Sequence, residues 1–189
     1  MEVMQQIPIL LMIMSAQILG WRPFTVQFLN ERYEIYHPDI INFNLTIKNA
    51  SYIDLTIDIL REISQLYIDF EDLHDSGNGT FDMVFMNRTV NICLFLNNRK
   101  SNPIFAIMFQ MFALHLDIPK RCPLRKKRYE VMNVFIDPDK YPPFMTDHKA
   151  KILANVWNGR NGRNGKKKYL IKLTFNVVIE RSFKGTVGP

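Results

Sequence analysis

The sequence predicts a mainly β protein, an immunoglobulin-like β-sandwich of seven or eight antiparallel strands with one inserted α-helix. Three observations favour this class: apolar and polar residues alternate over several short segments, turn residues separate those segments, and one middle stretch changes to a helical signal. The chain has 189 residues, of which 47% are hydrophobic, so it can bury one sizeable core. No linker composition divides it, and we expect one domain over residues 21–189.

An apolar leader precedes this domain. Residues 7–14 are almost wholly apolar, and the small residues Ser15, Ala16 and Gly20 follow them. This length suits the hydrophobic region of a signal peptide and is too short to span a bilayer. The first residues include Glu2 and no Lys or Arg, which departs from the usual pattern. We expect a signal peptide over residues 1–20 and a secreted, extracellular protein; the alternative is an uncleaved, buried N-terminal segment.

The first half of the domain predicts strands. Apolar residues occupy every second position over 41–47, 53–59, 66–70 and 81–85, with polar residues between most of them. Turn residues at 49–50 and 75–79 separate these segments. Period two over successive short segments indicates an antiparallel sheet with one solvated face.

A helix is predicted to begin at Asn102-Pro103, because Asn caps helices and Pro favours their first position. The following residues, Ile104 to Leu116, are apolar nearly all round. A surface helix of a small domain needs only one apolar stripe. This helix is therefore either covered on all sides or offers an apolar face to a partner. The residues expected to touch a ligand are Phe105, Met108, Phe109 and Phe112.

The second half returns to strands, predicted over 128–136, 149–157 and 169–179. The alternation of the first of these breaks near Asn133, which suggests a bulge. Asn-Gly repeats over 158–165 predict a hairpin tip, since both residues tolerate positive φ.

Covalent signals agree with a secreted protein. Four Asn-x-Ser/Thr sequons begin at Asn44, Asn49, Asn78 and Asn87, and we expect glycosylation there. The two cysteines, Cys93 and Cys122, predict one disulfide in an oxidising compartment, with two free buried thiols as the alternative.

No constellation of reactive groups points to an enzyme. The four histidines are scattered, and the sequence lacks a nucleophile elbow, a phosphate loop, a dinucleotide fingerprint and a zinc-protease motif. The acidic run 69–75 lacks the pattern of a calcium-binding EF-hand loop. We therefore expect a non-catalytic protein with no metal and no cofactor.

Basic residues gather in two stretches of a chain whose formal net charge is +6. The residues expected to contact an anion or a lipid headgroup are Arg125, Lys126, Lys127, Arg160, Arg163, Lys166 and Lys167. A secretory location disfavours nucleic acid, so anionic membrane surfaces or acidic glycans are the expected partners. The alternative is a face that only improves solubility.

One set of motifs resembles a known family. The motifs are the run Phe81–Cys93 with its Asn-x-Thr sequon, Lys100-Ser-Asn-Pro103, Arg121-Cys-Pro123, Tyr129, and Tyr141-Pro-Pro-Phe144. In this order they resemble the insect secreted family called domain of unknown function one thousand and ninety-one, which includes the CheB-type chemosensory proteins. That family resembles the ML lipid-recognition proteins and the ganglioside activator. The resemblance implies an ML-type sandwich that can open an apolar cavity between its sheets. Many relatives carry a second cysteine pair, which this chain lacks.

Two functions remain open at this point. The first is a secreted protein that binds a lipid or another hydrophobic ligand, with a chemosensory role, and with the apolar helix covering the ligand. The second is an extracellular interaction protein with a filled core that binds a receptor, a channel or a glycan. A continuous apolar cavity of several hundred cubic ångströms would favour the first, and dense packing the second.

Overall fold

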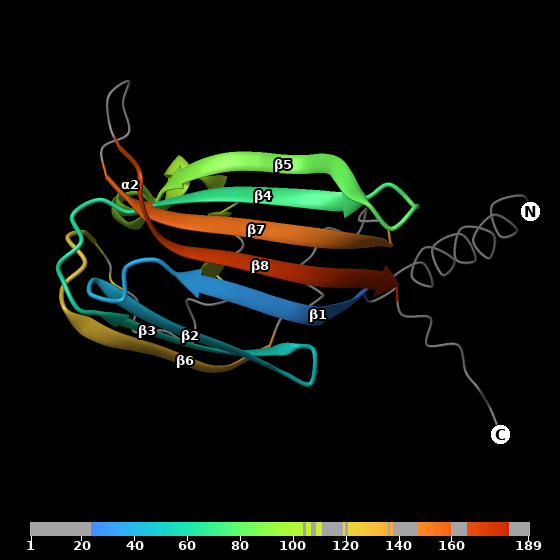
Figure 1. Cartoon of the computed structure of the whole chain (residues 1–189), viewed down its shortest axis with the longest axis horizontal. Coiled ribbons are helices and arrows are strands. Elements are labelled where there is room, and N and C mark those ends of the chain that lie inside the picture. The colour runs from blue at the N-terminus through green and yellow to red at the C-terminus, as the bar shows by residue number, and fades with distance from the viewer. Residues whose placement is uncertain are drawn as a thin grey trace, which may run out of the picture.

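The computed structural model describes residues 24–103, 105–106, 109–110, 119, 121–135, 137, 147–159 and 166–181. Within these residues, eight antiparallel strands form two sheets that face each other (Figure 1). The five-stranded sheet contains, in spatial order, β1 (Phe24–Ile35), β8 (Lys168–Arg181), β7 (His148–Asn158), β4 (Tyr67–Asp75) and β5 (Phe81–Asn91). The three-stranded sheet contains β2 (Ile41–Lys48), β3 (Tyr52–Ile59) and β6 (Lys127–Phe135). The predicted mainly β sandwich is confirmed.

The predicted turns explain how these strands connect. Asn49 and Ala50 both have positive φ, 49° and 57°, and join β2 to β3 in a tight hairpin. In the β4–β5 turn, the Asp75 carboxylate accepts hydrogen bonds from the backbone N–H groups of Gly77 and Gly79, each at 2.9 Å. The predicted bulge is confirmed, because Asn133 has a φ of 55° and the β3–β6 register shifts beside it.

Two elements were not predicted, the strand β1 and the helix α2. In β1 the register with β8 shifts between Phe28 and Asn30, so Leu29 is an extra residue that breaks the alternation. The helix α2 (Ile92–Asn97) is only six residues long and follows β5 directly. Its first turn is capped by Asn91, whose side chain accepts a hydrogen bond from the Leu94 N–H. A short 3₁₀ turn, η1 (Arg99–Ser101), comes next.

The start of the predicted apolar helix is confirmed. Asn102 caps it through its side chain, which accepts from the Phe105 N–H at 2.9 Å, and Pro103 takes the first helical position. Ile104, Met108 and residues 111–118 lie outside the described residues.

Antiparallel pairing gives the sandwich two distinct ends (Figure 1). We call one the α2 end: it carries α2, the last residues of β1, β3, β5 and β7, and the first residues of the other strands. We call the other the far end: it carries the β2–β3 and β4–β5 turns. Buried residues form one core cluster towards each end, with Ile171 in the first and Ile179 in the second.

The disulfide Cys93–Cys122 is present, with Cα atoms 5.4 Å apart, and it confirms the predicted pairing. It ties α2 to the segment that enters β6. The predicted signal peptide, residues 1–20, lies outside the described residues. Within the part of the chain that the structure describes, no helix is long and apolar enough to cross a membrane.

The expectation for the start of β5 needs a correction. Alternation placed Met83 and Phe85 on the covered face of a sheet, but 52% and 68% of their surfaces are exposed. The strand lies at the edge of its sheet, and its register with β4 shifts twice near these residues. Such irregularities turn side chains away from a regular two-residue alternation.

Candidate ligand-binding site

An apolar cavity of about 360 Å³ lies between the two sheets. This volume falls within the range of roughly 300–1,000 Å³ that is typical of ligand pockets. Strands of both sheets and α2 contribute hydrophobic side chains, and among the described lining residues only Tyr129 has a polar side-chain atom. The lining residues are Ile41, Phe43, Leu45, Ile53, Leu55, Ile57, Ile59, Ile63, Leu66, Ile68, Ile92, Leu96, Phe109, Pro119, Leu124, Tyr129, Val156, Ile171, Leu173 and Phe175.

The cavity is long rather than round. Ile53, Leu55, Ile57 and Ile59 of β3 all line it, and the six residue steps from the first to the last span about 20 Å. The hydrocarbon core of a bilayer is about 30 Å thick, so the acyl chains of one leaflet extend about 15 Å. An extended acyl chain therefore fits this shape better than a compact ring system does.

The predicted ligand-contact residues do not all share one site. Phe109 lines the cavity between the sheets and is partly buried against the core of the α2 end. Phe105 packs against the same core but lines a separate pocket of about 300 Å³, beside Phe70 and Arg88. Met108 and Phe112 lie outside the described residues.

Phe95 and Phe109 form an aromatic cluster that contacts Arg99, a residue that the sequence analysis did not select. The ring of Phe95 is buried and meets Phe109 edge-on, with centroids 5.2 Å apart. The Arg99 guanidinium carbon lies 4.1 Å from the Phe109 centroid and 5.0 Å from the Phe95 centroid. Burial lowers the pKa of Arg99. A basic residue four positions after a Phe, close to one helical turn, was the signal available in the sequence.

The fold brings the two predicted basic stretches to one end. Arg125, Lys126 and Lys127 lead into β6, while Lys166 and Lys167 lead into β8, and both strands begin at the α2 end. Arg160 and Arg163 lie outside the described residues.

These basic residues differ in their surroundings. Arg125, Lys126 and Lys166 are exposed and form no ion pair with any described residue. Lys167 is bound to Asp69 at 2.7 Å, and this hydrogen bond raises the pKa of Lys167. The ammonium of Lys127 lies 5.5 Å from the centroid of the Tyr129 ring, which lines the cavity.

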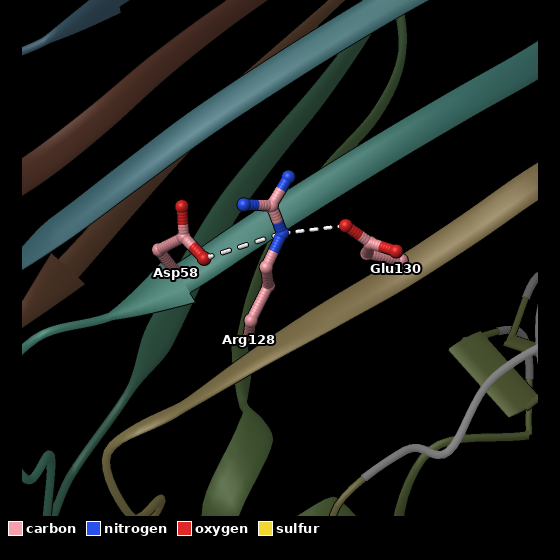
Figure 2. A network of polar contacts seen from close by, with 3 residues as sticks. All are labelled: Asp58, Arg128 and Glu130. Carbon is pink, nitrogen blue, oxygen red and sulfur yellow. Dashed lines mark hydrogen bonds and ion pairs between the residues drawn. The ribbon is translucent and has the colours of Figure 1, made fainter.

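Arg128, which follows Lys127 in the sequence, forms ion pairs within the three-stranded sheet instead. Figure 2 shows its guanidinium between the carboxylates of Asp58 and Glu130. Asp58 stands directly across from Arg128 in the β3–β6 ladder, with a separation of 3.7 Å between Oδ1 and Nε. Two acids therefore compensate this charge, and it adds little to an anion-binding surface.

A second polar cluster, also missed from the sequence, lies towards the far end. His74 stacks between Phe85 and His148, with ring centroids 4.6 Å and 4.2 Å away. Asp72 approaches the same histidine at 3.5 Å. Burial raises the pKa of Asp72 and lowers that of His74. Among the described residues, no group of three or more His, Cys, Asp or Glu side chains is arranged to hold a metal ion.

All four predicted glycosylation positions are exposed. Asn44 lies on β2 and Asn87 on β5, while Asn49 and Asn78 lie in the turns at the far end. The Asn78 side chain accepts hydrogen bonds from the Thr80 backbone N–H and hydroxyl. These positions are accessible for glycan attachment, and none of the four lies at the α2 end.

One comparison with known proteins identifies the central part of the chain. The model of the family described as "Protein of unknown function (DUF1091)" matches residues 66–152. Residues 66–152 form a DUF1091 domain. The domain runs from the entry to β4 through the disulfide and into β7, so it includes Phe109 and one of the two basic stretches. This confirms the family that the sequence motifs indicated. No curated protein matches the sequence.

Proposed function

We propose that this protein is a secreted, non-catalytic carrier of hydrophobic ligands, and that its ligand is a lipid with a single long acyl chain. The observation that carries this proposal is the elongated apolar cavity between the sheets. Burial of an acyl chain contributes about 0.8 kcal/mol per CH₂ group, so binding needs no polar contact inside the cavity. The resemblance to chemosensory proteins makes a chemosensory ligand the natural class.

Secretion is part of the same proposal. The disulfide, the exposed sequons and the apolar leader all suit the secretory pathway. The exposed cations at the α2 end suit an anionic membrane surface from which a lipid is collected or to which it is delivered, at about 1 kcal/mol per Lys or Arg.

The test is ligand capture by the secreted protein. Native mass spectrometry of material purified without detergent should show co-purified lipid, and delipidated protein should take up a fluorescent fatty acid. Folded, delipidated protein that takes up neither fatty acid nor any other apolar probe would contradict the carrier function.

A second candidate function rests on β5. Met83, Val84 and Phe85 are each more than half exposed on an edge strand, as is typical of a surface that contacts another protein. An extracellular receptor or channel would be the partner. Loss of receptor binding in Phe85→Ser, with fatty-acid uptake unchanged, would favour this interaction function.

A further inference from the structure

We propose that the ligand of the cavity carries an anionic head and that the Arg99 guanidinium binds this head at the α2 end. The inference rests on the proposed carrier function and deepens it, because it names the chemical class of the ligand and one residue that selects it.

The cavity itself cannot accept a polar head. The described residues of its lining are hydrophobic apart from Tyr129, and a polar group buried without a hydrogen-bond partner costs several kcal/mol on water-to-alkane scales. The head of an amphiphile must therefore lie at the margin of the cavity, where polar or charged groups can reach it.

Arg99 is not a lining residue, but it lies directly next to one, Phe109. Its guanidinium stacks on the ring of Phe109, 4.1 Å from the centroid, and Phe109 lines the cavity. A single aromatic ring thus separates the charge from the apolar space. A second cation repeats this arrangement, since Lys127 lies over Tyr129, which is also a lining residue.

Arg99 also lacks the partner that such a charge normally has. Its Nη1 group is buried and donates no hydrogen bond to a described residue, and no described carboxylate lies within ion-pair distance. Burial lowers its pKa, which shows that the surroundings disfavour the charge. The guanidinium remains protonated and its planar fork matches a carboxylate with two parallel hydrogen bonds. A bound anion would supply the missing compensation.

The experiment compares two ligands with the same chain and different heads. Dodecanoate and dodecanol would displace the probe N-phenylnaphthylamine from the full-length secreted protein at neutral pH. The wild type should bind dodecanoate at least about tenfold more tightly than dodecanol, as expected for a hydrogen bond to a charged group. Arg99→Gln should abolish this preference and leave dodecanol binding unchanged.

Lys100→Gln is the matched control. It removes the same charge at the next position, where the side chain is exposed and forms no ion pair with a described residue, and it should retain the preference for dodecanoate. If Lys100→Gln reduces the preference as much as Arg99→Gln does, the general field of the α2 end is responsible and the specific role of Arg99 is wrong.

Two results overturn the inference without touching the carrier function: a wild type that binds both ligands equally, or an Arg99→Gln variant that still prefers dodecanoate. Arg99→Lys keeps the charge and the stem that packs on the two Phe rings, so it serves if Arg99→Gln fails to fold. It should weaken dodecanoate binding severalfold and leave dodecanol unaffected. A probe that never binds the wild type would instead contradict the carrier function itself.

Discussion

The two ends of the sandwich both expose apolar side chains, but they differ in the charges around them. Tyr36, Leu60, Leu94 and Tyr169 are exposed at the α2 end, and Tyr52, Met83, Phe85 and Phe135 towards the far end. The exposed, described basic residues of the two predicted stretches lie at the α2 end, where Asp39 and Glu62 are also exposed; Asp75, Asp82, Asp137 and Asp147 lie near the far end, together with Lys48 and Lys149. Apolar surface beside cations suits an anionic membrane, and apolar surface beside acids does not.

The two ends also differ in how many of their buried residues line the cavity. Most of the buried residues that line the cavity belong to the core cluster of the α2 end, while only Leu45 and Ile53 come from the far-end cluster. The sequons at Asn49 and Asn78 lie in the far-end turns. The α2 end therefore combines most of the buried residues that line the cavity with the exposed cations of the two basic stretches, and it lies away from these two sequons. On the proposed carrier function, we therefore expect ligand exchange at the α2 end.

Breaking the disulfide should have the largest effect on this contrast. The Cys93–Cys122 bridge closes a loop over a sequence separation of 29, for which the chain-entropy model gives about 3–4 kcal/mol of stability. We expect Cys93→Ser with Cys122→Ser to lower the free energy of unfolding by this amount and to weaken fatty-acid uptake, because α2 lines the cavity. Chemical denaturation and probe titration measure both, and an unchanged unfolding midpoint would show that the α2 end does not depend on the bridge.

A matched pair of overpacking substitutions tests the two cores directly. Ile171 and Ile179 are both buried on β8, but only Ile171 lines the cavity. Ile179→Phe should cost about 1–3 kcal/mol, since a packed core has no room for the larger side chain. Ile171→Phe should cost less, because its ring can enter the cavity, and it should lower probe affinity. Thermal unfolding and probe titration distinguish them; equal destabilisation with equal probe affinity would mean that the two cores are equally packed.

The sequence predicted the strands wherever alternation ran without interruption, as in β2, β3 and β8. It missed β1 because the extra residue Leu29 shifts the alternation by one position, so the pattern no longer repeats along the segment. It missed α2 because six residues are too few to show a helical period. These misses are local, and they leave the predicted class intact.

The site was less predictable than the fold. Phe109 was selected from the excess of apolar residues in its helix, and it does line the cavity. The cavity itself depends on how side chains from two sheets fill the space between them, which no local pattern records. Arg99 became apparent only when its place over the Phe95 and Phe109 rings was known. The stack of His74 on His148 joins two strands far apart in the sequence.

Charge reversal sharpens the contrast at the surface. Lys126→Glu and Lys168→Glu change exposed residues at the α2 end, and Lys149→Glu makes the same change at the far end. Each change at the α2 end should weaken binding to phosphatidylserine-containing vesicles by a factor of about five or more. This follows because each Lys near an anionic membrane contributes about 1 kcal/mol of binding free energy. Vesicle co-sedimentation at two salt concentrations measures this. An effect of Lys149→Glu as large as the others would mean that net charge, not the α2 end, governs membrane binding.

The smallest expected effect is a pH dependence that arises from His74, towards the far end. Burial holds the folded-state pKa of His74 below its unfolded value of about 6.5. Below that pH the unfolded state binds the proton more readily than the folded state does. The free energy of unfolding is therefore highest above this pH and decreases as the pH falls below it. Asp72 opposes the loss, because its carboxylate attracts the imidazolium, so we expect less than about 1 kcal/mol between pH 7 and 5. His74→Phe keeps a ring between Phe85 and His148 and removes the titration. Denaturation curves across this window should fall more steeply for the wild type than for the variant, and parallel curves would show that His74 does not couple protonation to folding.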